Sequence, residues 1–356
     1  RKLPALAVLV ARGQVMLRTG RLCCARAGYV AHGQVMLRTG SLRLRNRIAM
    51  PPGGFFMAYR RVSKGLPGKV DFLTLVVLLG PALILFTAFV VIPVFEAAVF
   101  SLYKWNGLGP MKDFRGLANY LQFVKDSIVH KALGHNLIIA VVSLAGELPL
   151  AMALALIVSD RKFKGAVFFR TFFFLPYMLS EVITGVLWQF IYHPQYGLVK
   201  SFFTFFLPDA QAPALMGNTS TVLWAILVVI IWKYFGLHMT IYIAGLQDIP
   251  QEQIEAARID GASKSQTFWS IILPGMRTSV QLSVFFSMIG SFQLFDLVWA
   301  MGKGDPVNAG ETIVTYMYKV GLTRFNIGYG STIAVCIFLI CLVFSILYQR
   351  VLAREN

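Results

Sequence analysis

Six long apolar segments limit what this chain can fold into. A helix needs about 20 largely apolar residues to cross the hydrocarbon core of a bilayer. Segments of that kind lie at residues 72–96, 137–158, 171–192, 221–246, 278–301 and 327–349. Because 57% of the 356 residues are hydrophobic and only 14% are charged, too little polar surface remains for a water-soluble globule. The sequence therefore predicts an all-α membrane protein with six transmembrane helices.

Prolines inside or near the ends of these segments predict kinks. They are Pro81, Pro93, Pro149 and Pro176. A proline removes a backbone donor and its ring clashes with the preceding turn of a helix. Neighbouring helices in a membrane bundle can satisfy the freed carbonyl, whereas a lone soluble helix could not.

The basic charge of the chain is concentrated at its start. Residues 1–70 hold 14 Lys and Arg and no acidic residue, so the rest carries +3 of the total net charge of +17. Nucleic-acid binding needs a clustered basic face on a folded module, and this distribution argues against it. Residues 14–20 recur unchanged as 34–40, but two copies are too few for a repeat fold. We expect residues 1–57 to be a disordered or non-native leader, with a functional basic tail as the alternative.

Cysteine and histidine spacing predicts neither a disulfide framework nor a metal site. Cys23 and Cys24 are adjacent in the leader, while Cys336 and Cys341 lie in an apolar segment, where buried thiols are expected. No histidine has a partner acid or cysteine at a zinc-ligand spacing. His130 and His135 are five residues apart and are expected to lie in a loop. The sequence therefore predicts no metal and no cofactor.

A polar stretch at residues 247–277 separates the fourth and fifth apolar segments. Pro250 suits the first turn of a helix, and residues 251–259 are compatible with that helix. Gly261 is suited to the left-handed conformation that ends it. Ser263, three residues before a glutamine, matches a capping box that starts a second short helix running to Pro274. The stretch is therefore predicted to fold as a helix, a glycine turn and a second helix.

Small and charged side chains give this stretch the character of a docking surface. Ala256 and Ala257 permit the close approach of another surface. Glu255 and Asp260 offer negative charges to basic groups on a partner. The alternative is a solvated loop that only joins two spans, because charged runs usually face water.

The order of these residues resembles a known loop. Glu255-Ala256-Ala257, with Gly261 four residues after the second alanine and Leu273-Pro274 twelve further on, is similar to the loop by which permeases of ATP-binding-cassette (ABC) importers contact their ATPase. The flanking sequence resembles the binding-protein-dependent carbohydrate-uptake branch, which includes maltose and glycerol-phosphate permeases. The similar segments are Gly116–Tyr120, Arg170–Phe172, Leu175–Tyr177, Trp188, Tyr196–Leu198, Trp232–Gly236, Leu246–Pro250, Phe295 and Asp296. The resemblance covers about residues 72–350 and departs at Met301–Pro306, where relatives commonly have Thr-Gly-Gly-Gly-Pro.

The resemblance implies a type I ABC importer permease fold, with a permease domain at residues 58–356 and a cytoplasmic coupling loop at 247–277. It implies the membrane-spanning subunit of an ATP-driven sugar importer in the cell (inner) membrane. The partners would be a second permease, two ATPase subunits and an extracytoplasmic sugar-binding protein. The residues that would dock the ATPase are Glu255, Ala256, Ala257, Asp260, Gly261, Leu273 and Pro274.

The orientation follows mainly from this loop. Because ATP is cytosolic, a loop that contacts an ATPase places both termini in the cytoplasm. With that orientation, the inside segments from residue 58 onward hold 13 Lys and Arg and the outside loops hold nine, a weak bias in the expected direction.

The sequence does not predict catalysis by this chain. It contains no Gly-x-x-x-x-Gly-Lys-Ser/Thr loop to hold phosphates. Gly65–Val70 has too short a spacing, and Val70 lacks a hydroxyl for magnesium. ATP hydrolysis is therefore assigned to a partner subunit.

Charged residues in or near spans are functional candidates, because charge is costly in a bilayer. They are Glu96, Glu147, Glu181, Lys233 and Asp296. For Lys233 and Asp296, a structural partnership between helices is the stronger alternative. Candidates for holding a sugar lie in the third to fifth spans, which form the translocation core of the resembled family: Trp188, Gln189, Tyr192, Trp232, Tyr234, Phe292, Gln293 and Asp296. For the aromatic members, packing or lipid contact is the alternative.

Two other function classes compete with the importer. A secondary transporter or channel working without an ATPase is the alternative function, and it predicts an inverted internal repeat that the body does not display. A membrane enzyme finds no support, because the sequence has no set of nucleophile and base and no metal spacing.

Overall fold

Helices form nearly all of the described structure. The computed structural model describes residues 72–160, 163–206 and 213–353. The predicted leader, its repeat, Cys23, Cys24 and Gly65–Val70 lie outside the described residues. Strand β1 (Tyr103–Lys104) pairs antiparallel with β2 (Asp113–Phe114).

The helices follow one another with short connections. Up to the fourth predicted span they are α2 (Phe72–Phe86), η2 (Thr87–Val91), α3 (Ile92–Phe100), α4 (Ala118–Lys125), α5 (Ser127–Val142), η3 (Ser143–Glu147), α6 (Leu148–Ser159), α7 (Ala166–Met178), α8 (Glu181–Ile191) and α9 (Leu198–Phe206). The rest are α10 (Val222–Gln247), α11 (Gln251–Ile259), α12 (Lys264–Thr267), η4 (Phe268–Ile272), α13 (Leu273–Gly275), α14 (Arg277–Gln293), α15 (Asp296–Gly302), α16 (Ile313–Tyr318), η5 (Lys319–Thr323) and α17 (Ile327–Ala353). Segments labelled η are π-helical.

Four helical stretches are long and apolar enough to cross a membrane. They are Val77–Phe100, Ser127–Ser159, Val222–Gln247 and Ile327–Val351. Two further candidates are helix pairs, α7 with α8 and α14 with α15, which are bent by 97° and 45°. The structure thus has four to six candidate spans, and the helices at the spans predicted for residues 171–192 and 278–301 are each interrupted within the span.

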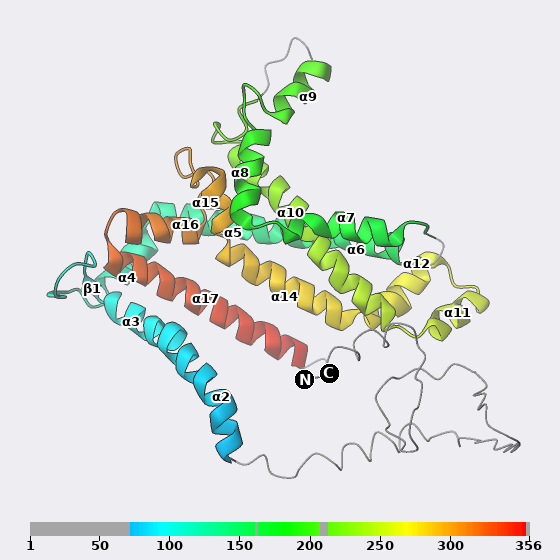
Figure 1. Cartoon of the computed structure of the whole chain (residues 1–356), viewed down its shortest axis with the longest axis horizontal. Coiled ribbons are helices and arrows are strands. Elements are labelled where there is room, and N and C mark those ends of the chain that lie inside the picture. Colours follow the sequence, from blue (N-terminus) through cyan, green and yellow to red (C-terminus); the bar gives the residue numbers. More distant parts are fainter. Residues whose placement is uncertain (1–71, 161–162, 207–212, 354–356) are drawn as a thin grey trace, which may run out of the picture. The chain divides into compact units, whose positions relative to one another are not determined.

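Extended backbone causes the sharper of these bends. Leu179 and Ser180 adopt ψ angles of 140° and 146°, so the helix stops after Met178 and restarts at Glu181. A buried lysine holds the break, because Lys233 Nζ donates a 2.6 Å hydrogen bond to the Leu179 carbonyl. In Figure 1, α9 stands away from the other helices, whereas α8 packs against α15.

The second span begins earlier than expected. The prediction placed its start at residue 137 and residues 130–135 in a loop, but α5 begins at Ser127. Asp126 caps the helix by accepting a 2.9 Å hydrogen bond from the Ile128 amide. The prediction was wrong because the first turns of α5 contain polar residues and so lack the apolar pattern of a span. The helix start is determined instead by the cap.

Prolines accompany three of the π-helical turns. η2, η3 and η4 each run directly into a segment that has proline at its first or second position: Pro93, Pro149 and Pro274. Proline cannot donate to the carbonyl one turn earlier and clashes with it, so the backbone widens there. The kinks predicted at Pro93 and Pro149 therefore take the form of π turns.

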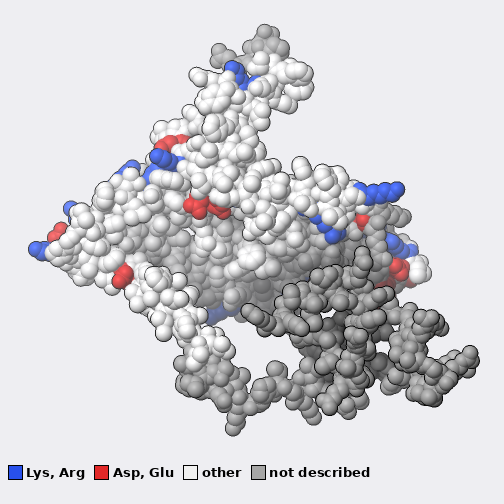
Figure 2. All heavy atoms as spheres, viewed as in Figure 1, with Lys and Arg blue, Asp and Glu red and all other residues white. Residues whose placement is uncertain are grey.

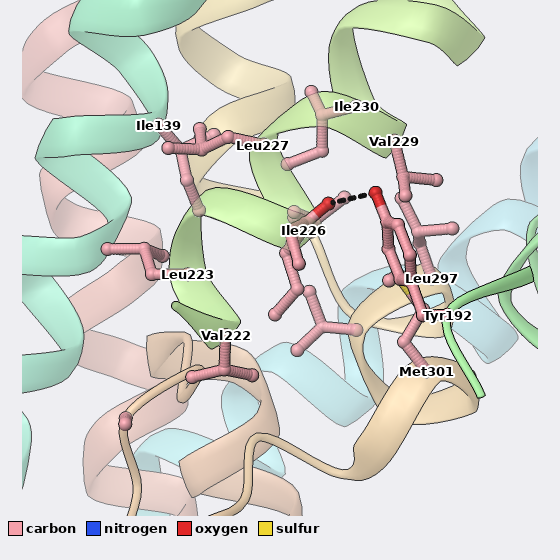
Figure 3. Packing of buried hydrophobic residues seen from close by; sticks show 14 residues of the cluster. Ile139, Tyr192, Val222, Leu223, Ile226, Leu227, Val229, Ile230, Leu297 and Met301 are labelled. Atoms are coloured by element: carbon pink, nitrogen blue, oxygen red, sulfur yellow. Dashed lines mark hydrogen bonds between the residues drawn. The ribbon is translucent and has the colours of Figure 1, made fainter. Parts of the chain in front are cut away.

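Helix α10 is the centre of the packing. It contacts α6, α7 and α14, and more than half of the membrane-length window within it is buried. Figure 3 shows its residues Val222, Ile226 and Val229 among the buried cluster around Leu297. Many large apolar side chains are exposed on the outer surface of the described structure, and Figure 2 shows a largely uncharged face. An apolar exterior around a packed interior fits a protein surrounded by lipid.

A glycine allows α7 and α10 to approach closely. Gly236 of α10 is buried, and a Cβ atom there would overlap the carbonyl oxygen of Phe173 in α7. The ring of Phe173 also packs against Phe235, with centroids 5.7 Å apart. A side chain at position 236 would force α7 and α10 apart.

Candidate functional site

A cavity of about 500 Å³ lies where the two bent helix pairs meet α10. Its walls come from α5, η3, α7, α8, α10, α14 and α15, and both helix breaks border it. In a membrane, non-helical backbone is tolerated where it is buried in protein or lines a polar cavity. The breaks therefore mark this cavity as the leading candidate for a functional site.

Three carboxylates line the cavity. Glu181 and Asp296 are in the first turns of α8 and α15, and Glu147 is the last residue of η3. Tyr234 donates a 2.5 Å hydrogen bond to Glu181 Oε1. Glu147 is buried, and its Oε1 lies 3.3 Å from His238 Nε2. The π turn brings Glu147 into this wall together with Ser143.

Three of the eight predicted pathway residues line the cavity: Tyr234, Gln293 and Asp296. The other five do not line it, and four of them have packing or structural contacts. Gln189 donates to the Met301 carbonyl at 2.9 Å, and Tyr192 donates to the Ala225 carbonyl at 3.1 Å, as drawn in Figure 3. Trp188 and Trp232 pack edge to face, with centroids 5.4 Å apart. Phe292 is half-buried outside the lining.

Sequence reasoning missed several lining residues that carry polar groups. They are Ser143, Tyr177, His238, Ser287 and Ser291. The serines of α14 had a detectable signal, because Ser283, Ser287 and Ser291 recur every four residues and all are buried on one face. A buried polar stripe in an apolar helix indicates the side that faces protein or water rather than lipid.

The polar stretch at residues 247–277 folds as expected. α11 spans Gln251–Ile259, and Gly261 has a φ of +79°. The capping box is complete: the Gln266 amide donates to Ser263 Oγ at 3.3 Å, and the Ser263 amide donates to Gln266 Oε1 at 2.8 Å. The predicted helix, glycine turn and second helix are confirmed.

The predicted docking residues lie at the surface of this loop. Glu255, Ala256, Asp260, Gly261 and Pro274 are exposed, and Ala257 and Leu273 are partly exposed. Two large apolar side chains not included in the prediction are exposed beside them, Ile259 at 86% and Trp269 at 64%. Exposed large apolar residues next to a polar rim are typical of an interaction surface.

An ionic cluster joins the loop between α15 and α16 to the start of η5, and one of its members, Asp305, lies in the segment where the sequence departs from the resembled pattern. Lys319 Nζ lies 2.7 Å from Glu311 Oε2 and 3.4 Å from Asp305 Oδ1. Burial raises the pKa of Glu311, and Lys319 offsets only part of that effect. Sequence reasoning did not identify this cluster, because Asp305, Glu311 and Lys319 have no recognisable spacing and meet only through folding.

Comparisons with known proteins identify the family. Residues 147–355 match the family described as "Binding-protein-dependent transport system inner membrane component". The probable ABC transporter permease YurN of Bacillus subtilis is 34% identical over 273 residues, which cover 76% of this chain and 93% of the relative. The multiple sugar-binding transport system permease MsmF of Streptococcus mutans is 30% identical over 74% of this chain and 90% of its own length.

A solved structure shares the fold. A chain of a bacterial ABC transporter involved in importing the acidic polysaccharide alginate superposes with a TM-score of 0.70. It is 20% identical, and the match covers 84% of this chain and 99% of that chain. The chain thus belongs to the binding-protein-dependent inner membrane components, as a multi-pass, non-catalytic permease subunit of an ABC importer.

Proposed function

We propose that this chain forms one wall of the translocation pathway of an ATP-driven sugar importer. The observation that carries the proposal is the cavity at the two helix breaks, whose lining includes three carboxyl side chains, within a chain of the permease family. The names of several relatives support a sugar-type cargo, since they include permeases for multiple sugars, diacetylchitobiose and glycerol 3-phosphate. Complete function requires a second permease, two ATPase subunits and an extracytoplasmic binding protein.

The loop at residues 247–277 is the docking site for the ATPase in this proposal. Glu255, Ala256, Ala257, Asp260, Gly261, Leu273 and Pro274 form its contact surface, and we add Ile259 and Trp269 because both are exposed. The loop is built before the partner arrives, since the capping box and the glycine turn fix its two helices. A preformed surface lowers the ordering cost of association.

A continuous series of helices connects the loop with the cavity. α11 contacts α12, α12 contacts η4, η4 contacts α13, and α13 contacts α14, which lines the cavity. A displacement of α11 by an ATPase is therefore passed to the wall that carries Ser287 and Gln293. Such a connection is what a two-state pump needs, because ATP must bias the conformation of the pathway.

The orientation follows from this assignment. With each bent pair counted as one span, the chain crosses the membrane six times, as a type I importer permease with both termini in the cytoplasm. In Figure 1, α11 and α12 lie at one end of the helices, and β1 and α4 lie at the other. The two ends then correspond to the cytoplasmic and outer faces, and residues 58–356 form the permease domain, with residues 1–57 dispensable.

The direct test is purification of the tagged chain from native membranes, followed by reconstitution. We expect an ABC ATPase and a second permease to co-elute, and uptake of radiolabelled neutral oligosaccharides to require ATP and the binding protein. A chain beginning at Met57 should behave in the same way. Uptake that persists without ATP, together with no co-eluting ATPase, would show a secondary transporter instead.

A further inference from the structure

Two carboxylates give the cavity wall its negative charge. Glu181 and Asp296 line it from the first turns of α8 and α15, while Glu147 is buried with its Oε1 3.3 Å from His238 Nε2. The residues of the described chain that line the cavity include no lysine or arginine, and His238 is the one basic residue among them. A ligand in the cavity therefore meets Glu181 and Asp296 with no lysine or arginine beside them in the described lining.

The nearest lysine to this wall is Lys233 of α10. It interacts electrostatically with Glu181 but does not line the cavity. Its ammonium group is buried and donates to the Leu179 carbonyl at 2.6 Å. Withdrawing it to bind a ligand would leave the extended backbone at the α7–α8 break unsatisfied, which is costly in a membrane.

The helix starts that border the cavity also carry carboxylates. The amino end of a helix attracts negative charge, so a bare helix start could hold an anionic ligand. Here Glu181 occupies the first turn of α8, and Asp296 occupies the first turn of α15. These side chains take the place of an external anion.

The hydrogen-bonding groups favour ligands that donate. The Tyr234 hydroxyl donates to Glu181, and the Ser291 hydroxyl donates to the Ser287 carbonyl at 2.7 Å. Ionised carboxylates accept several hydrogen bonds each and donate none. Sugar hydroxyls and amino groups are donors that fit such a wall, whereas phosphate, sulfonate and carboxylate groups need donors themselves.

We propose that this cavity selects cargo without negative charge, namely neutral or amino sugars, and discriminates against phosphorylated, sulfonated and uronate sugars. The inference rests on the proposed function, since it assigns a cargo class to the same pathway. The proposed cargo differs in charge from the cargo named for the relatives that transport glycerol 3-phosphate or sulfoquinovosyl glycerol, and from the alginate of the solved importer.

The charge of the cavity can be measured without knowing the cargo. Gly290 lines the cavity, is exposed, and would have no heavy atom within 4 Å of an added Cβ atom, so Gly290→Cys fits without strain. The four native cysteines are first replaced by alanine. In membranes containing the assembled importer, the thiol is then modified with a cationic trimethylammonium methanethiosulfonate or its anionic sulfonate analogue. Gln122→Cys, on the exposed surface of α4, is the surface reference.

The expected result is a preference for the cationic reagent. A cleft lined by one sign of charge raises the local concentration of counter-ions by at least about tenfold. The ratio of the cationic to the anionic modification rate should therefore be higher for Gly290→Cys than for Gln122→Cys by about that factor. Glu181→Gln combined with Asp296→Asn should return the ratio toward the surface value. Glu96→Gln, at an exposed position on α3 outside the cavity, should leave it unchanged. An unbiased or anion-preferring thiol, or one that neither reagent reaches, overturns the proposal.

Transport separates this inference from the proposed function. ATP-driven uptake of a glycerol phosphate or an oligouronate by the reconstituted importer would overturn the charge assignment and leave the importer assignment intact. Absence of a co-purifying ATPase would overturn the importer assignment, whatever the modification rates. Uptake of neutral or amino sugars with exclusion of the anions supports both.

Discussion

Tyr316 donates a 2.6 Å hydrogen bond to the carboxylate of Asp126, although 190 residues separate the two in the sequence. Tyr329 donates to the same oxygen at 2.8 Å. Both tyrosines are buried, and Asp126 also caps α5. One carboxylate therefore joins the start of the second span to α16 and α17.

Asp126→Ala should destabilise the protein more than an ordinary surface substitution. It removes a helix cap and leaves two buried hydroxyls without their acceptor, which together cost at least about 2 kcal/mol. The measurement is the thermal midpoint of the solubilised importer. Asp113→Ala, at an exposed position in β2, is the control and should leave the midpoint unchanged. Equal midpoints for the two variants would contradict the role of Asp126.

The same carboxylate predicts a loss of stability in acid. Burial works to raise the pKa of Asp126, but the hydrogen bonds from Tyr316, Tyr329 and the backbone outweigh it and hold the pKa below its ordinary value. A group with a lowered pKa in the folded state stabilises above the unfolded pKa of about 3.9, and this stability disappears as the pH falls through the folded pKa. The wild-type midpoint should therefore drop below about pH 4 more steeply than that of Asp126→Ala. Parallel pH profiles for the wild type and Asp126→Ala would count against a stabilising role of the ionised Asp126 carboxylate.

Gly236→Ala should separate α7 from α10. Because the added methyl group would overlap the Phe173 carbonyl oxygen, backbone rather than a flexible side chain must move. We expect loss of about 1–3 kcal/mol of stability or failure to assemble, as for other overpacked sites. Gly134→Ala is the matched control, since that helical glycine is exposed with nothing within 4 Å of a new Cβ. Normal assembly of Gly236→Ala, scored by co-purification with the ATPase, would refute the close crossing.

Gly261→Asp should uncouple transport from ATP hydrolysis. The added side chain meets no neighbour within 4 Å, so its effect comes from the φ of +79°, which β-carbon-bearing residues resist. Asparagine adopts this region more readily than most residues, so Gly261→Asn should keep more of the coupling. The readouts are uptake and the stimulation of ATPase by the loaded binding protein, with membrane insertion as the control. Undiminished uptake in Gly261→Asp would remove the argument for a docking loop.

Tyr234→Phe should lower the efficiency of uptake while keeping the aromatic ring. The substitution removes the hydroxyl that donates to Glu181, a charge-assisted bond worth about 1.5 kcal/mol or more, which corresponds to roughly tenfold in kcat/KM. Tyr177→Phe removes the hydroxyl of another tyrosine of the same wall, and it tests whether loss of any hydroxyl there lowers the efficiency of uptake. Transport kinetics that do not differ between the two variants would show that the Tyr234–Glu181 pair has no special role.

Local signals predicted the fold of the loop at residues 247–277 well. Gly261 and the interval from Ser263 to Gln266 act through backbone geometry and short-range hydrogen bonds, so their effects are readable from neighbouring residues. For the α7–α8 break, Pro176 predicted a kink nearby but not the extended backbone at Leu179 and Ser180, because the bond from Lys233 that holds it depends on tertiary packing. Trp188 and Tyr192, predicted as pathway residues, pack in or against the buried cluster and do not line this cavity, and that placement also depends on tertiary packing.

The π turn at Ser143–Glu147 has a consequence for any alignment of this span. A π turn accommodates one extra residue, so the helix after it is out of phase by about 100° with the helix before it. A single helical wheel drawn through Ser127–Ser159 would therefore assign the wrong side to every position after residue 147. Deleting one residue from this turn should rotate Ala151 and Ala155 out of their packed positions, even though composition and length would hardly change.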